Sequence, residues 1–242
     1  MNSHGGPPPS HGSFFQRIAY LLSQKGECAM SKTPQNILRI DASMRRENSV
    51  SRMLATELAD ALGARKPSSS LVSRDLALGV GIVNEGWITA NHTPEENRTP
   101  TQHALLALSD ALVAEVKAAD TIIIAVPVYN FSIPAALKAW IDLICRSALT
   151  YEFDDELYES AGMLEEKRVF AIVTSGGTAA GSPQDYATGY LSHVFGFLGI
   201  SDFQLIDATG IARDRNAALA KARSQIKAIA DNRDQQRQKA AE

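Results

Sequence analysis

The chain has little cysteine and no excess of positive charge, and these two features limit the classes of protein to which it can belong. Its 242 residues include only two cysteines, Cys28 and Cys145, which lie far apart. That usage fits a reducing cytoplasm better than a disulfide-bonded secreted scaffold, so we expect a cytoplasmic protein. The formal net charge is -3 at pH 7. The basic surface of a nucleic-acid binder is therefore not expected.

Long hydrophobic runs and metal-ligand patterns are also missing. No stretch approaches the roughly 18 apolar residues of a membrane-spanning helix, so we expect no membrane span. Neither cysteine has a histidine or second cysteine near it in sequence, so no activated thiol is expected. Five histidines occur without metal-ligand spacing, and we expect no metal site: His4, His11, His92, His103 and His193.

Two common nucleotide-binding patterns are absent as well. No Gly-Lys-Ser/Thr sequence follows a strand pattern, which excludes a Walker loop. The one Gly-x-Gly is Gly79-Val-Gly81, and Asn84 stands where a dinucleotide fingerprint needs its third glycine. A bound monophosphate is thus favoured over a pyrophosphate.

Composition divides the chain into three parts. Residues 1–35 contain Pro7 to Pro9 with several glycines and serines, and we expect a flexible N-terminal extension. Met30 is an alternative start, and a targeting role for the extension stays open. Residues 36–232 are expected to form one domain, because a chain with 45% hydrophobic residues can bury a single large core. Residues 233–242 read as a polar C-terminal tail.

Strand and helix patterns alternate within that domain. Strands are expected at 36–40, 71–76, 121–128, 168–174 and 203–207. Helices are expected at 51–62, 103–118, 135–146, 186–198 and 213–232, the last ending in a polar stretch expected to fray. Residues 77–100 and 149–165 are expected to be irregular. This order predicts an α/β fold, a doubly wound five-stranded parallel sheet with helices on both faces.

Ligands of such sheets bind beyond the carboxyl ends of the strands, so the loops there are the candidate site. The first loop is rich in hydroxyls and opens a helix near Ser49 to Ser51. Helix N-termini bind phosphate well, and Ser43, Ser49 and Ser51 can each donate a hydrogen bond to it. Arg45, Arg46 or Arg52 is a candidate for added charge. Plain capping by Ser49 is an equally good reading of this loop alone.

The second and third loops follow the two central strands. Tyr129-Asn130-Phe131 ends the most apolar run of the chain, where a flat aromatic ligand is expected. An ordinary strand-to-helix turn remains the alternative. Ser175-Gly-Gly-Thr178 brings bare backbone near a ligand, although Gly-Gly turns are common.

Together these loops resemble the FMN-dependent NAD(P)H azoreductase and quinone reductase family, which has a flavodoxin-like fold. The resemblance covers residues 37–230. It also includes the segments Asp110 to Lys117, Leu137 to Leu143, and Gly189 to Ile200. Two positions depart from the family pattern. Val128 stands where methionine is frequent, and Ser-Gly-Gly-Thr replaces a frequent Ser-Arg-Gly-Gly, so substrate preference cannot be transferred.

The resemblance implies a role for each loop. The FMN phosphate would be held by Ser43, Ser49, Val50 and Ser51. The isoalloxazine ring would be lined by Val128, Tyr129, Asn130 and Phe131. Its far edge would contact Ser175, Gly176, Gly177 and Thr178. Tyr151 and Phe153 match aromatic residues near the family's substrate pocket.

The resemblance also implies an activity: an FMN-dependent NAD(P)H oxidoreductase that reduces quinones and azo compounds by two-electron, ping-pong hydride transfer. The cofactor supplies the chemistry, so no catalytic side chain is expected. Family members are homodimers, and a homodimer is expected here. No ribose-reading motif decides between NADH and NADPH. The alternatives are a flavodoxin-like one-electron carrier and a binding or regulatory module, with or without flavin, that has no reductase activity.

Overall fold

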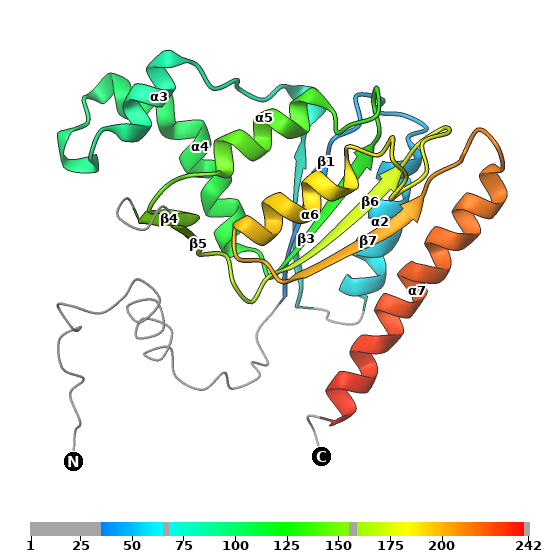
Figure 1. Ribbon diagram of the computed structural model, residues 1–242. Coiled ribbons are helices and arrows are strands. Elements are labelled where there is room, and N and C mark those ends of the chain that lie inside the picture. The colour runs from blue at the N-terminus through cyan, green and yellow to red at the C-terminus, as the bar shows by residue number, and fades with distance from the viewer. Residues whose placement is uncertain (1–34, 65–67, 155–158, 240–242) are drawn as a thin grey trace, which may run out of the picture.

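The computed structural model describes residues 35–64, 68–154 and 159–239. Five parallel strands form its central sheet in the order β2-β1-β3-β6-β7 (Figure 1). Their bounds are β1 (Asn36–Asp41), β2 (Ser70–Asp75), β3 (Thr121–Pro127), β6 (Arg168–Thr174) and β7 (Asp202–Ala208). The predicted flavodoxin-like, doubly wound five-stranded sheet is confirmed. The expected extension at 1–35 lies, apart from Gln35, outside the described residues.

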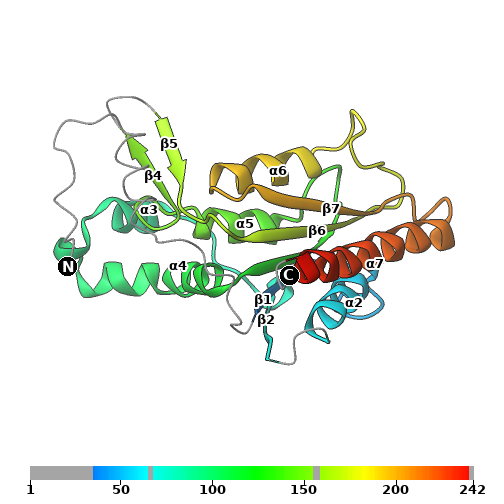
Figure 2. The same ribbon diagram turned by 90° about the horizontal axis from the view of Figure 1, so that it is seen from below.

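Helices cover both faces of the sheet. Figure 2 shows α2 (Val50–Gly63) and α7 (Arg215–Lys239) on one side, with α5 (Ala135–Ile144) and α6 (Thr188–Phe197) on the other. The remaining long helix, α4 (Pro100–Ala118), packs on the face of α5 and α6. It starts three residues before the predicted start, because Thr99 and Gln102 form a capping box. Helix α7 continues beyond its predicted end at Asn232 to Lys239.

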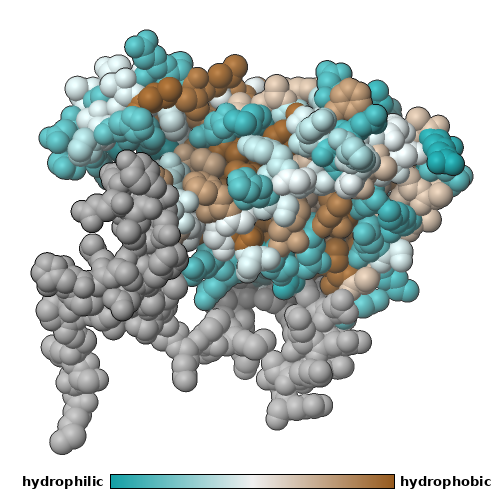
Figure 3. Space-filling view, viewed as in Figure 1, coloured by the Kyte–Doolittle hydropathy of each residue, from teal (hydrophilic) through white to brown (hydrophobic). Residues whose placement is uncertain are grey.

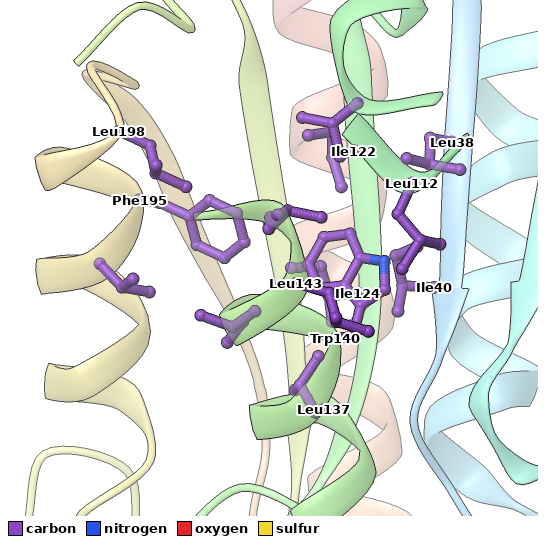
Figure 4. Packing of buried hydrophobic residues seen from close by; sticks show 14 of the residues in the cluster. Leu38, Ile40, Leu112, Ile122, Ile124, Leu137, Trp140, Leu143, Phe195 and Leu198 are labelled. Carbon is purple, nitrogen blue, oxygen red and sulfur yellow. The ribbon is translucent and has the colours of Figure 1, made fainter. Parts of the chain in front are cut away.

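The core has two halves, one on each face. Ile122 and Ile124 of β3 pack with Trp140 of α5 and Phe195 of α6 (Figure 4). Their neighbour Ile123 points the other way, into the cluster of α2 and α7. Successive side chains of a strand alternate between faces, so a sheet covered on both faces needs continuous apolar strands. This is why β3 is the most apolar run of the chain.

The prediction that residues 77–100 are irregular is wrong in part. The segment contains α3 (Glu85–His92), flanked by the short 3-10 helices η1 (Leu76–Leu78) and η2 (Glu95–Asn97). The Asn84 side chain caps α3 by accepting a hydrogen bond from the Trp87 N–H at 2.9 Å. Trp87 is buried against the core. Tertiary burial of one large side chain stabilises a helix too short and polar to be recognised by its periodicity.

The prediction that residues 149–165 are irregular is also wrong in part. They contain an antiparallel hairpin of β4 (Tyr151–Asp154) and β5 (Glu159–Gly162). Just after the hairpin, the Leu164 N–H donates a hydrogen bond to the Leu198 carbonyl at 2.9 Å, which connects this segment to the C-terminal end of α6. Among the described residues, no helix combines the length and hydrophobicity needed to cross a bilayer.

Candidate functional site

The carboxyl ends of four strands surround one pocket of about 300 Å³. This pocket, called the loop pocket below, is lined by all three predicted loops and by a fourth that follows β7. The first loop contributes Ser43, Arg45, Asn48, Ser49 and Val50; the second Pro127, Val128 and Tyr129; the third Thr174, Ser175 and Gly176; the fourth Ile211, Ala212 and Arg215. Its place at the carboxyl edge of the sheet is where open α/β folds bind ligands.

The first wall is the N-terminus of α2. Ser49 is its N-cap, and the Ser49 Oγ accepts from the Arg52 N–H at 3.5 Å and lies 3.2 Å from the Ser51 Oγ. Ser51 is buried and does not line the loop pocket. The first turn of α2 contains no acidic residue. Free N–H groups, a hydroxyl and the positive end of the helix dipole therefore face the pocket, an arrangement suited to an anion.

Ser43 starts the first loop and is buried beneath the pocket. Its hydroxyl lies 3.2 Å from both the N–H and the carbonyl oxygen of Arg45, so it holds a tight turn. The Arg52 Nη2 donates to the Ser43 carbonyl at 2.6 Å. The start of the loop is thus held in place by a side chain of α2.

The arginines named from the sequence have different partners. Arg52 is paired with Asp75 at 2.5 Å and Arg46 lies 3.7 Å from the same carboxylate. The hydrogen bond from Arg52 holds the pKa of Asp75 below its usual value. Within the described part of the chain, Arg45 and Arg215 have no ion-pair partner, and both line the pocket. The sequence patterns did not identify Arg215 as a residue of the site.

The second wall is the turn that follows β3. Tyr129 and Ser132 exchange two backbone hydrogen bonds of 2.9 and 3.1 Å. Asn130 and Phe131 between them have φ angles of +48° and +72°. This is the geometry of a tight type I′ turn, which is unusual for a residue as bulky as phenylalanine. Neither central residue lines the loop pocket, and Phe131 is 53% exposed.

Hydrogen bonds join that turn to the loops on either side. The Tyr129 hydroxyl accepts from the Met44 N–H at 3.2 Å, which connects the second loop to the first. The Tyr186 N–H donates to the Phe131 carbonyl at 3.0 Å, which connects it to the segment before α6. The position of Tyr129 is therefore determined by three segments that are far apart in sequence.

The third wall is the turn that follows β6. The Ser175 hydroxyl donates to the Thr178 carbonyl and closes the turn. The Ile211 and Ala212 N–H groups donate to the Ser175 and Gly176 carbonyls, each at 3.0 Å, and so align the fourth loop beside the third. A Cβ atom on Gly177 would meet no atom within 4 Å, and one on Gly176 would make only an ordinary contact. The protein itself would therefore have room for a larger residue at either position. The two glycines instead leave open space beside the backbone of this turn.

The structure does not bring Tyr151 and Phe153 to this pocket. Both belong to β4, and the Tyr151 ring packs on Phe197 with centroids 4.9 Å apart. Phe153 is exposed. The hairpin lies at the C-terminal end of α6, whereas the loops meet near its N-terminal end (Figure 1). Ten helical residues separate the two ends, a length of about 15 Å.

Comparisons with known proteins agree with this architecture. A family described as having a flavodoxin-like fold matches residues 35–230. The FMN-dependent NADH:quinone oxidoreductase 1 of Jannaschia sp. (strain CCS1) is 48% identical over 195 residues, which are 81% of this chain and 98% of that protein. The protein of the same name from Hahella chejuensis is 45% identical over 202 residues, or 84% of this chain and 98% of that one.

A solved structure adds a likeness of fold. It is the crystal structure of an FMN-dependent NADH-azoreductase from Bacillus anthracis in complex with FMN. It superposes with a TM-score of 0.74 at 23% identity, covering 82% of this chain and 98% of that one. From the family match and the two curated relatives, the chain belongs to the flavodoxin-like fold family that includes the FMN-dependent NADH:quinone oxidoreductases.

Proposed function

We propose that this protein is an FMN-dependent NADH:quinone oxidoreductase that also reduces azo compounds. The observation that carries the proposal is the loop pocket, where a hydroxyl-rich helix N-terminus, an aromatic turn and a glycine turn meet at one edge of the sheet. Curated relatives that are 45–48% identical over nearly their whole length bear the name of that activity.

The described residues fit FMN in both chemistry and placement. The phosphate would lie at the N-terminus of α2, against Ser43, Ser49 and the N–H groups of Val50 and Ser51. The ring would lie along Val128 to Phe131, with Ser175 to Thr178 at its other edge. The open space beside Gly176 and Gly177 supports this assignment, because a ligand can approach the backbone there.

FMN, when bound, supplies the hydride-transfer chemistry, and the protein contributes binding, orientation and electrostatics. Tyr129 holds the aromatic turn against the first loop through the Met44 N–H. The Ser175 turn and the fourth loop form a hydrogen-bonded wall opposite. We propose ping-pong kinetics, with NADH and the acceptor occupying the same space beside the Tyr129–Phe131 turn one after the other.

The nicotinamide donor and the acceptor are assigned by similarity. The two curated relatives are named for NADH and for quinones, and the structural relative for NADH and azo compounds. We therefore propose NADH as the donor and a quinone as the main acceptor. Val128 lines the loop pocket, and the Ser175 turn beside it contains no arginine. We propose that these two positions influence which acceptor is reduced.

We further propose a cytoplasmic homodimer. Tyr151 and Phe153 do not line the loop pocket of their own chain, and in the proposed dimer they would lie at the pocket of the second copy. Apolar side chains are exposed between β2 and α3, with Leu78 at 72% and Ile82 at 80%. Figure 3 shows apolar atoms gathered over this part of the molecule. The two cysteines lie far apart in sequence, and this cysteine usage fits the reducing environment of the cytoplasm. Light scattering of the purified protein tests the dimer.

An absorbance spectrum of the purified protein, supplied with FMN and then with NADH under anaerobic conditions, tests the activity. We expect a flavin spectrum that NADH bleaches and that a quinone restores. A spectrum that dithionite bleaches and NADH leaves unchanged would favour the one-electron carrier. Protein that remains colourless after FMN is added would favour a flavin-free binding module and refute the proposal.

A further inference from the structure

We propose that Arg215, in the first turn of α7, binds the flavin phosphate and makes the pocket selective for FMN over unphosphorylated flavin. The inference rests on the proposed function and extends it to a residue of the fourth loop. Arg215 follows the last strand of the sheet and is 164 residues beyond Ser51, the end of the predicted phosphate loop (215 − 51).

The distribution of charge around the pocket leaves Arg215 free to bind an anion. Three other arginines near the α2 N-terminus have acidic partners: Arg39 is 3.0 Å from Asp41, Arg52 is 2.5 Å from Asp75, and Arg46 is 3.7 Å from Asp75. Their charge is largely compensated within the protein. Among the residues that the structure describes, Arg45 lines the pocket without an acid within ion-pair distance, and the same holds for Arg215. A phosphate in the loop pocket would be its anionic partner.

Arg215 also lies close to the start of α2. A second pocket, of about 490 Å³, lies beside the loop pocket and contains Arg39, Asp41 and Arg52 in its wall. The two pockets share four lining residues, which are Asn48, Ser49, Val50 and Arg215. Arg215 therefore lies beside the cap of α2, where the phosphate is expected. Arg215 belongs to α7 and lines both pockets, although α2 and α7 start in different halves of the chain.

Arg215 occupies an unfavourable position in its own helix. A cation in the first turn of a helix is disfavoured by the helix dipole. The capping of α7 is done by Asp214, whose Oδ1 accepts from the Ala217 N–H at 2.9 Å. Arg215 thus contributes nothing to the cap and occupies a position that helix formation does not favour. A ligand anion beside it would remove this cost.

The test compares two flavins that differ only in the phosphate. Dissociation constants of FMN and riboflavin are measured by quenching of flavin fluorescence for the full-length wild type, Arg215→Gln and Arg215→Lys. The matched control is Arg213→Gln, which removes an exposed arginine two residues upstream that does not line the pocket. Thermal melting of each flavin-free variant verifies that it is folded.

We expect Arg215→Gln to weaken FMN binding about tenfold and to leave riboflavin binding unchanged, as the loss of one charge-assisted hydrogen bond predicts. Arg215→Lys should restore part of the affinity, and Arg213→Gln should match the wild type. Raising the ionic strength should weaken FMN binding to the wild type more than to Arg215→Gln, because exposed charges are screened by salt.

Three results would overturn the inference. Wild-type FMN affinity in a folded Arg215→Gln variant would remove Arg215 from the phosphate site. An equal loss for FMN and riboflavin would mean that Arg215 supports the pocket without recognising phosphate. A wild-type protein that binds neither flavin would refute the proposed function itself, a result distinct from the other two.

Discussion

Arg52 and Asp75 form a two-point ion pair that links the start of α2 to the end of β2. The Arg52 Nη1 lies 2.9 Å from the Asp75 Oδ2 and the Nη2 lies 2.5 Å from the Oδ1. The same Nη2 donates to the Ser43 carbonyl at 2.6 Å. One side chain therefore connects a helix, a neighbouring strand and the first loop of the pocket. Planar arginine suits such a fork, and lysine would not replace it.

Asp75→Asn should lower the free energy of unfolding in a pH-dependent way. The Arg52 hydrogen bond lowers the pKa of Asp75 in the folded protein. A carboxyl with a lowered folded pKa stabilises the protein above its unfolded pKa, near 3.9, and this stability is lost as the pH falls through the folded pKa. We expect a loss of roughly 1–2 kcal/mol at pH 7 that diminishes below about pH 4.

Urea unfolding at pH 7 and at pH 3 measures this difference. Asp60→Asn, on the exposed side of α2, is the control and should change little at either pH. A loss for Asp75→Asn that is the same at both pH values would contradict the assigned role of the ion pair.

Ser49 substitutions separate helix capping from phosphate binding. Ser49→Ala removes the cap and the hydroxyl, and should weaken FMN binding about ten- to a hundredfold. Ser49→Asp retains a capping oxygen for the Arg52 N–H but places a negative charge at the phosphate. We expect its free energy of unfolding to remain within about 0.5 kcal/mol of wild type, with FMN affinity below that of Ser49→Ala. Flavin titration and thermal melting give both values. Wild-type FMN affinity in Ser49→Ala would leave capping as the role of Ser49.

Phe131→Gly should stabilise the protein while it impairs the site. Phe131 adopts a φ of +72°, which costs a bulky residue about 1 kcal/mol or more and costs glycine almost nothing. Its side chain is more than half exposed, so little buried area is lost. Glycine also gives the unfolded chain more conformational freedom, which offsets part of the relieved strain, so we expect a net gain of up to about 0.5 kcal/mol in the free energy of unfolding. Phe131→Ala is the matched control, since its Cβ retains the strain. If the ring contacts flavin, both variants should bind FMN more weakly.

Gly162→Ala should loosen the hairpin that contains Tyr151 and Phe153. A Cβ atom at Gly162 would overlap the backbone of Leu198 and Gly199, where β5 meets the end of α6. Because backbone cannot move aside as a flexible side chain can, we expect a loss of roughly 2–3 kcal/mol in the free energy of unfolding. Gly189→Ala in α6, where the new Cβ meets nothing within 4 Å, should instead be neutral or stabilising by up to about 1 kcal/mol. Equal melting temperatures for the two variants would contradict this account.

The sheet could be predicted because the amino-acid composition of a strand reflects whether one or both of its faces are buried. β3 and β6 are covered on both faces, so each is a short, mostly apolar run rich in β-branched residues, as is typical of a buried parallel strand. Helix α3 was missed because it is short, and its stability comes from the Asn84 cap and the burial of Trp87. The β4–β5 hairpin was missed because its polar strands derive their order from docking against α6.

The residues of the three loops were named from the sequence, because carboxyl-end loops of a parallel sheet meet at one edge whatever their separation along the chain. Which arginines form ion pairs within the protein and which remain unpaired could not be predicted from the sequence. Arg45, Arg46 and Arg52 look equivalent in sequence, yet Asp75 at the end of β2 engages the last two and leaves Arg45 facing the pocket. Likewise Arg215 carries no local signal, since its importance depends on where α7 begins relative to α2.

By itself, the sequence determined the order of the five sheet strands and of the five helices that cover them, the family resemblance and the three segments at the pocket, because hydrophobic periodicity and loop composition are local properties. Only the tertiary structure decided which charges are paired, which loop completes the pocket as a fourth wall, and that Tyr151 and Phe153 lie a helix length away from it. The physical reason is that ion pairing and distance depend on the relative placement of elements, and that placement is set by packing of the whole core.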